Sequence, residues 1–374
     1  MGEPAPETAA AVHDLLAAVA GLEHRFTGEE AVLGTEASVL DGYRWMFSIL
    51  AVGLDAYVWA DPARPRFVDI VGPTRKWGGD NADAFYQYAI VDPARTYRVT
   101  GRAADAVYFS LTVYGGPADG HYSERIVGSV HDGDLAVGDD GTFAVVLGPA
   151  RPPGWDGPFI ALEHDAVCAI TRDYLEHPGA QRRMTWAIEC IDERVGADTP
   201  ALHDAELARR FRAAATWVRD QAALAPLHLG EADNAVDDPY PVPQQTFGWA
   251  AGDAAYAMGR YALGDGEALV IRGRSPACRF WNLCLWNEFL HTYDYAYGRV
   301  TINGAEVVAE ADGSWTIVVS ADDPGHPNWL TTQGRATGNL WFRWFLPEHT
   351  PIRPACQVVS LSEVPPAPAS TARG

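Results

Sequence analysis

The sequence nearly lacks one common residue type. Its 374 residues include 28 lysines and arginines, but Lys76 is the one lysine. A preference for arginine, together with abundant Ala, Gly, Pro and Asp, is typical of GC-rich coding. Our hypothesis is that position 76 requires a compact ammonium group with an adjustable pKa, and the alternative is a lysine that coding drift has not replaced.

Basic residues are also few compared with acidic ones. The 49 aspartates and glutamates give the chain a net charge of −21. Such a charge repels phosphate groups, so the composition argues against nucleic acid or an anionic membrane surface as a partner. The simplest interpretation of the excess acid is solubility.

Signals for export and membrane insertion are missing as well. No apolar run approaches the roughly 20 residues that a membrane helix needs. The opening stretch "MGEPAPETAAAVHDLL" has no basic region followed by an apolar core, as a signal peptide would have. The five cysteines are odd in number and form no CxxC pair, which predicts reduced thiols. We therefore expect a cytoplasmic protein with no membrane partner.

Familiar catalytic motifs are absent too. The sequence contains no GxSxG, no HExxH, no Walker loop and no Rossmann glycine pattern at the start of a βαβ unit. It also lacks the paired histidines of metal-binding cupins, since His121 and His131 are separated by a turn-rich stretch. We therefore expect neither a metal ion nor another cofactor.

Helical and strand patterns divide the chain. Apolar residues at helical spacing predict two opening helices, from Val12 to Leu22 and from Val39 to Leu54, and Thr35 can cap the second. A third helical segment lies between Pro200 and Pro226. From Phe67 onward, short alternating runs separated by Asp-Gly, Gly-Gly and Pro-Gly pairs indicate strands and tight turns.

The strand regions repeat at an offset of 172 positions, at which Trp77 falls on Trp249. Three more matches share the offset: Gly101-Arg102 with Gly273-Arg274, 107–114 with 279–286, and 140–147 with 312–319. The predicted fold class is mainly β with helical additions, built from two tandem jelly-roll-like antiparallel β-sandwich modules. The predicted parts are an N-terminal helical segment (1–66), a first module (67–199), a linking helix (200–226), a second module (227–362) and a disordered tail (363–374).

One strand of the first copy is apolar on both faces. In "VYFSLTVY", Val107, Phe109, Leu111 and Val113 alternate with Tyr108, Ser110, Thr112 and Tyr114. Because the second face is not very polar, we expect a helix or the sister module to cover it.

Two long blocks resemble a known family. "DNADAFYQYAIVDPARTYRVTGRAADAVYFSLTVY" and "DGSWTIVVSADDPGHPNWLTTQGRATGNLWFRWFLPE" resemble the bacterial Domain of Unknown Function 1214 proteins. The element Asn81-x-Asp83-x-x-Tyr86 is similar to one in the sister family, Domain of Unknown Function 1254. The resemblance runs from about Lys76 to Ser360 and implies a pair of jelly-roll-like modules. It assigns no function and no catalytic residues.

Three constellations could carry chemistry, and the first surrounds the single lysine. Lys76 could donate to a substrate oxygen, with Asp80 or Asp83 as a base. Paired glycines beside it allow the backbone to approach a ligand closely. The alternative is a simple ion pair. The other candidate binding residues of this stretch are Trp77, Asn81 and Tyr86.

The second constellation consists of two loops at matching positions of the repeat. The first carries His121, Tyr122, Glu124 and Arg125, and the second carries His291, Tyr293, Asp294 and Tyr295. Equivalent loops project from equivalent ends of related sandwiches, so we expect both to line one crevice. The alternative is a pair of solvated loops.

The third constellation is the turn "DPGHPNWL", which presents His326, Asn328 and Trp329. These residues could bind a ligand, but a structural turn with a packed tryptophan is the favoured alternative.

Aromatic residues cluster near these loops and suit a cavity for an uncharged, partly apolar ligand. The predicted function is an enzyme that uses metal-independent general acid–base chemistry, as a hydrolase or a lyase or isomerase, on a small neutral organic substrate such as a glycoside, terpenoid or aromatic. His121 and Glu124 would transfer protons, while Lys76 and Tyr122 would stabilise charge on oxygen. The alternatives are a non-catalytic carbohydrate- or lipid-binding protein and a structural or assembly protein. A small-molecule ligand is the expected partner, and a homo-oligomer is left open.

Overall fold

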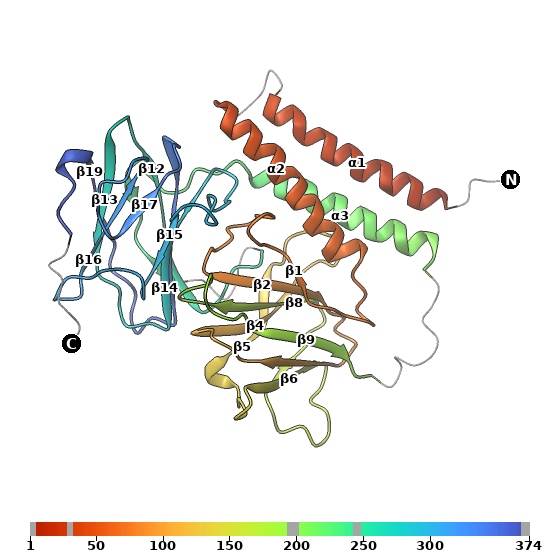
Figure 1. Cartoon of the computed structure of the whole chain (residues 1–374). Coiled ribbons are helices and arrows are strands. Elements are labelled where there is room, and N and C mark those ends of the chain that lie inside the picture. Colours follow the sequence, from red (N-terminus) through yellow and green to blue (C-terminus); the bar gives the residue numbers. More distant parts are fainter. Residues whose placement is uncertain (1–4, 28–32, 193–201, 242–247, 368–374) are drawn as a thin grey trace.

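The computed structural model describes residues 5–27, 33–192, 202–241 and 248–367. Its helices are α1 (Pro6–Thr27), α2 (Glu36–Gly53), the π-helical turn η1 (Leu54–Val58) and α3 (Asp204–Leu224). The three α-helices lie together as a layer beside the first module (Figure 1). The hydroxyl of Thr35 accepts a hydrogen bond from the amide of Ser38 at 3.1 Å, as predicted for an N-cap.

The first module contains nine strands. They are β1 (Val68–Asp69), β2 (Ala84–Ile90), β3 (Tyr97–Arg102), β4 (Tyr108–Gly115), β5 (Arg125–His131), β6 (Thr142–Gly148), β7 (Phe159–Ala161), β8 (Ala166–Tyr174) and β9 (Thr185–Cys190). One sheet has the order β1-β2-β8-β4-β5, and the other has the order β7-β6-β3-β9. The short 3-10 helix η2 (Asp132–Asp134) follows β5.

The second module contains ten strands. They are β10 (Ala235–Val236), β11 (Tyr240–Pro241), β12 (Ala254–Ala262), β13 (Glu267–Gly273), β14 (Phe280–Trp286), β15 (Thr301–Asn303), β16 (Trp315–Ser320), β17 (Trp329–Thr331), β18 (Thr337–Phe345) and β19 (Ala355–Ser360). One sheet has the order β10-β12-β18-β14-β15, with β11 also paired to β12, and the other has the order β17-β16-β13-β19. The 3-10 helix η3 (Leu361–Glu363) ends this module.

The two modules share one strand order. Adding ten to each strand number of β2-β8-β4-β5 and β7-β6-β3-β9 gives the corresponding orders in the second module. This confirms a mainly β fold built from two repeated modules. The strand pairs are antiparallel, as predicted, except that β6 pairs with β7 and β16 pairs with β17 in parallel. In each case the connecting loop carries the chain back along the sheet before it pairs. The strand order does not confirm the jelly-roll part.

Each module has its own apolar core between its two sheets. Phe109, Leu111 and Val113 of β4 lie in the first core, as their alternation predicts. The opposite face of β4 is covered, as expected for a face with little polarity. Tyr114 packs beneath the helical layer, and Tyr108 packs against the second module.

The modules meet through aromatic residues at equivalent positions. Tyr108 and Tyr174 correspond to Phe280 and Phe345. The ring centroids of Tyr108 and Phe345 are 5.3 Å apart, and those of Tyr174 and Phe280 are also 5.3 Å apart. Such reciprocal contacts are typical of a two-fold relationship. The two larger sheets therefore face each other at the junction.

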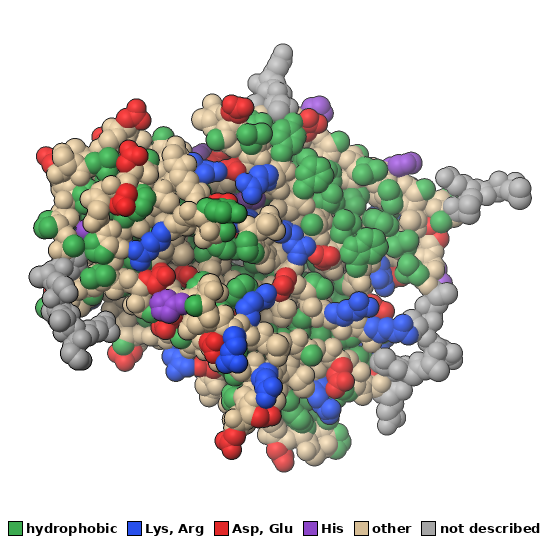
Figure 2. Space-filling model, in the orientation of Figure 1, with side chains coloured by type: hydrophobic (Ala, Val, Ile, Leu, Met, Phe, Trp, Pro, Cys, Tyr) green, Lys and Arg blue, Asp and Glu red, His purple; other side chains and the backbone are tan. Residues whose placement is uncertain are grey.

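Acidic and basic side chains are interspersed over one face of the molecule, and hydrophobic side chains gather over the helical layer (Figure 2). All five cysteines are free thiols. No helix among the described residues is both long enough and apolar enough to cross a membrane. Most of the predicted disordered tail, residues 368–374, lies outside the described residues.

Candidate ligand site

A cavity of about 270 Å³ lies where the two modules and α3 meet. Its wall comes from the loop before β2, the loop before β12, strands β8, β14 and β18, and the last turns of α3. The lining aromatic residues are Trp45, Trp77, Tyr86, Tyr122, Tyr174, Trp217, Trp249, Tyr256, Trp286, Phe289 and Trp341.

Tryptophans form two groups on this wall. The rings of Trp77, Trp217 and Trp249 lie with centroids 5.0 to 5.4 Å apart. Trp286 stacks on Trp341 at 4.9 Å. The indole N–H of Trp77 donates to the Gln221 side-chain oxygen at 2.8 Å. The ring faces of these tryptophans provide an apolar surface.

The paired glycines before β2 bring the backbone close to this wall. Gly78 and Gly79 have φ values of +62° and +79°, a region that glycine adopts readily. A Cβ atom at Gly79 would lie 2.7 Å from the Trp286 ring. The close approach that the sequence predicted is therefore to a tryptophan of the second module.

Two buried arginines also line the cavity, one from each module. Arg172 on β8 pairs with Ser110 of β4, and Arg343 on β18 pairs with Asn282 of β14. Ser110 and Asn282 are equivalent, because they are 172 positions apart, so the arginines occupy equivalent places. Arg172 donates to the Tyr114 hydroxyl at 2.7 Å and to the Trp249 carbonyl at 2.5 Å.

Arg343 makes similar contacts. It donates to the Gly79 carbonyl at 2.7 Å and to the Cys284 thiol at 3.4 Å, and its guanidinium lies 4.9 Å from the Trp286 ring centroid. Our sequence analysis missed both arginines. The only signal was a single arginine near the end of a strand in each copy, at an offset of 171 instead of 172.

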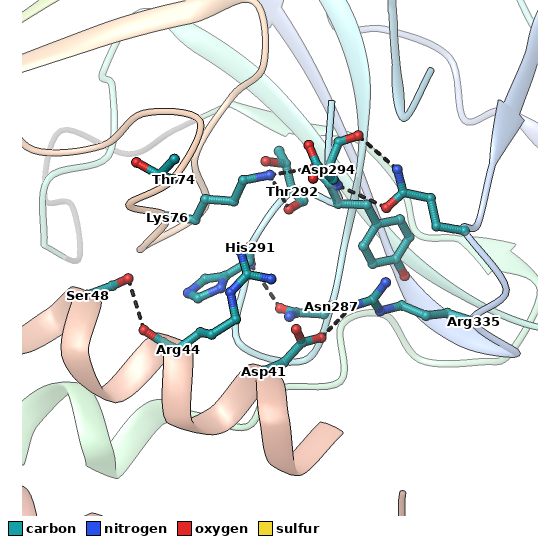
Figure 3. Close-up of a pocket in the computed structure, with 12 residues that line it drawn as sticks. Asp41, Arg44, Ser48, Thr74, Lys76, Asn287, His291, Thr292, Asp294 and Arg335 are labelled. Atoms are coloured by element: carbon teal, nitrogen blue, oxygen red, sulfur yellow. Dashed lines mark hydrogen bonds and ion pairs between the residues drawn. The ribbon is translucent and has the colours of Figure 1, made fainter. Parts of the chain in front are cut away.

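Lys76 lies outside this cavity, beside a separate polar pocket of about 120 Å³ (Figure 3). Its ammonium is buried and donates to the carbonyls of Thr292 and Tyr293 at 2.7 and 2.5 Å. It also lies 4.4 Å from the Tyr295 ring centroid. Burial lowers the pKa of Lys76, while the Asp80 carboxylate opposes that shift. The lysine therefore anchors the β14–β15 loop and lines this small pocket.

The same small pocket contains residues of the second loop and of α2. His291 and Asp294 line it together with Asp41 and Arg44 of α2 (Figure 3). The His291 Nε2 atom is buried and has no hydrogen-bond partner among the described residues. Burial lowers the pKa of His291 to about 3, so the imidazole is neutral at pH 7.

The first loop sends its side chains in different directions. Tyr122 lines the aromatic cavity. His121 is exposed and lies 3.0 Å from Asp220 of α3, whose hydrogen bond raises the pKa of the histidine. Glu124 is exposed as well. Arg125 pairs with Asp165 at 2.5 Å on the surface. His121 and Glu124 do not line the cavity that Tyr122 reaches, so the expected single crevice with both histidines was wrong.

The Asn-Ala-Asp run lies buried against the second module. The Asn282 amide donates to Asn81 and Asp83 at 2.7 and 2.8 Å. Burial raises the pKa of Asp83 to about 7. Asp80 lines the aromatic cavity, and its carboxylate accepts hydrogen bonds from the amide and hydroxyl of Thr292.

The predicted turn residues are structural in their contacts. The Asn328 side-chain amide donates to the carbonyls of Val308 and Thr316, both at 2.8 Å. The His326 Nδ1 atom accepts the amide of Asn328 at 3.1 Å. Trp329 belongs to β17. These contacts favour the structural alternative for the turn.

The fold and the cavity define a β protein of two repeated modules with an aromatic hollow at their junction. A model of the family described as "Protein of unknown function (DUF1214)" matches the chain in two segments, residues 86–177 and 260–349, one in each module. The predicted element of the sister family is not supported by this match. No curated protein matches the chain.

Two solved structures are similar to the whole fold. An uncharacterized protein from Burkholderia cenocepacia has a TM-score of 0.84 and 26% identity, over 96% of this chain and 99% of that one. The VPA0106 protein from Vibrio parahaemolyticus has a TM-score of 0.50 and 14% identity, over 86% of this chain and 98% of that one. The second likeness concerns the fold alone. Neither description names a ligand or a reaction.

Proposed function

We propose that the protein binds one small, largely apolar organic molecule in the cavity at the module junction. The observation that carries this proposal is the 270 Å³ hollow lined by aromatic rings from both modules and from α3. This volume is about twice that of the ~150 Å³ apolar cavity that holds one benzene. A body of about two fused rings or a short terpenoid chain therefore fits.

The geometry favours binding over the predicted acid–base reaction. Burial raises the pKa of three tyrosines in the cavity wall, Tyr86, Tyr122 and Tyr256. These hydroxyls keep their protons at neutral pH and act as hydrogen-bond donors. The Asp80 carboxylate is already occupied by Thr292. The roles of His121 and Glu124 in proton transfer stay a prediction, because neither side chain lines the aromatic cavity.

Calorimetric titration with a neutral aromatic probe, 2-naphthamide, tests the proposal. We expect saturable binding to the wild type and about tenfold weaker binding to Trp341→Ala, because the variant loses one stacking face of the cavity. The matched control is Trp59→Ala, since Trp59 is 65% exposed and does not line the cavity. Equal binding by the two variants, or no binding by the wild type, would contradict the proposal.

A further inference from the structure

The two cavity arginines differ from Arg335, a partly buried arginine that forms an ion pair at the junction. Arg335 lies 2.6 Å from the Asp41 carboxylate beside the small polar pocket (Figure 3). Among the described residues, neither Arg172 nor Arg343 has a carboxylate oxygen within 4.0 Å. Their recorded partners are neutral: hydroxyls, a thiol and backbone carbonyls. The chain therefore places two positive charges in the cavity wall without a direct counter-ion.

Two acidic side chains that act on the arginines electrostatically make hydrogen bonds to other groups, although the Asp253 Oδ1 atom is buried without a partner among the described residues. Asp253 accepts a hydrogen bond from the Tyr108 hydroxyl, and Asp80 is held by Thr292. Both carboxylates act on the arginines from a distance. They offset part of the charge without using the remaining guanidinium N–H groups. Arg343 uses two of its five N–H groups in recorded hydrogen bonds.

Further hydrogen-bond donors on the cavity wall lack an acceptor. The indole N–H of Trp341 is buried and has no partner among the described residues. The same is true of the amide nitrogen of Gln221. The orientation of this amide is fixed, because the Trp77 N–H can only donate and therefore faces the Gln221 oxygen. Both side chains thus present spare N–H donors.

Burying a charge or a donor without a partner costs free energy, so such groups usually have an acceptor when a site is occupied. An anion supplies hydrogen-bond acceptors to the guanidinium groups and to the other N–H groups together. Its attraction to the positive charges is strongest where water is excluded. A bare inorganic anion would leave the ring faces uncovered. The cavity therefore combines an apolar wall with a cluster of donors.

We propose that the ligand of this cavity is an organic anion, a carboxylate on an aromatic or terpenoid-sized apolar body, whose charged group is held by Arg172 and Arg343. This inference rests on the proposed function, since it names the chemistry of the ligand for the same cavity. It differs from the neutral substrate that we predicted from the sequence. The module duplication explains the site, because it delivers one arginine from each side of the junction.

The test compares two probes of the same size, 2-naphthoate and 2-naphthamide, by calorimetric titration of the full chain at pH 7. We expect the wild type to bind 2-naphthoate at least about tenfold more tightly, because charge-assisted hydrogen bonds are roughly twice as strong as neutral ones. Arg343→Gln and Arg172→Gln should each remove most of this preference. The control is Arg274→Gln, an exposed arginine that pairs with Asp312 at 2.8 Å.

The outcomes separate the two proposals. If the wild type binds both probes equally, the anion inference fails and the proposed binding function stands. If neither probe binds up to about 1 mM, both proposals fail. Retained 2-naphthamide binding shows that a glutamine variant is folded around an intact cavity. If a glutamine variant does not fold, the wild-type preference between the two probes still decides the question.

Discussion

The rings of Tyr174 and Phe345 pack across the module junction with centroids 4.3 Å apart, although they occupy equivalent positions in the two repeats. A residue meets its own counterpart only near a two-fold axis. Arg172 and Arg343 each lie two residues earlier on the same strand faces, so they too approach the junction. The cavity is therefore a product of the duplication, and neither module could form it alone.

The backbone at Gly79 should tolerate no side chain. Gly79→Ala would place a Cβ atom 2.7 Å from the Trp286 ring, in addition to the strain of φ +79°. We expect a loss of about 2–4 kcal/mol in the free energy of unfolding, measured with urea. Gly78→Ala is the matched control, because its φ is +62° and its Cβ would meet nothing within 4 Å. A similar loss in both variants would show that backbone strain alone, and not the tryptophan, dictates glycine.

Much of the fold could be predicted because its signals are local or periodic. The Thr35 cap, the strand alternation around Leu111 and the shared offset of Trp77 and Trp249 each depend on short stretches or on direct comparison. The two tryptophans do meet, with ring centroids 5.4 Å apart. The parallel pairing of β6 with β7 could not be predicted, because a loop of given length permits either direction.

The site was harder to predict because its partners lie far apart in the sequence. His121 and Glu124 are neighbours along the loop, yet His121 is paired with Asp220, 99 residues away. We missed Arg172 and Arg343 because the offset between the two copies changes along the chain. It is 172 positions between β4 and β14 but 171 positions between β8 and β18. A charged residue in an otherwise apolar strand, present in both copies, is the signal that would have found them.

His291 should make the fold sensitive to acid. Burial lowers the pKa of His291 to about 3, and the neighbouring cations Lys76, Arg44 and Arg335 act in the same direction. The pKa of histidine in the unfolded chain is about 6.5. Because the pKa in the folded protein is lower, the free energy of unfolding decreases as the pH falls below about 6.5. Between pH 7 and pH 5 the loss should be about 2 kcal/mol.

Urea unfolding of His291→Gln and wild type at the two pH values measures this contribution. We expect the variant to lose less stability than the wild type on acidification. His349→Gln is the control, because His349 is exposed. If both variants show the wild-type pH dependence, the imidazole of His291 gains a proton without cost, and its burial has no energetic effect.

Asp83 should make the fold less stable as the pH rises, which is the opposite of the effect of His291. Burial raises its pKa to about 7, with hydrogen bonds from Asn282 and Thr301 opposing the shift and the charge of Glu306 adding to it. A carboxyl group whose folded-state pKa is raised stabilises the fold below its unfolded value of about 3.9, and that stability is lost as the pH rises through about 7. On going from pH 5 to pH 8, the wild type should therefore lose at least about 1 kcal/mol more of its free energy of unfolding than Asp83→Asn does. Urea unfolding checks this, with exposed Asp322→Asn as the control.

Lys76 should resist replacement even by arginine. Its ammonium reaches two carbonyls of the β14–β15 loop from a buried position, and a planar guanidinium is bulkier and cannot occupy the same point. We expect Lys76→Arg to lower the free energy of unfolding by about 1–3 kcal/mol. Arg75→Lys is the neighbouring control, since Arg75 is partly exposed in its ion pair with Asp55 and such pairs contribute about 0–1 kcal/mol. Equal stability of the two variants would mean that coding drift, and not the carbonyl pair, explains the single lysine.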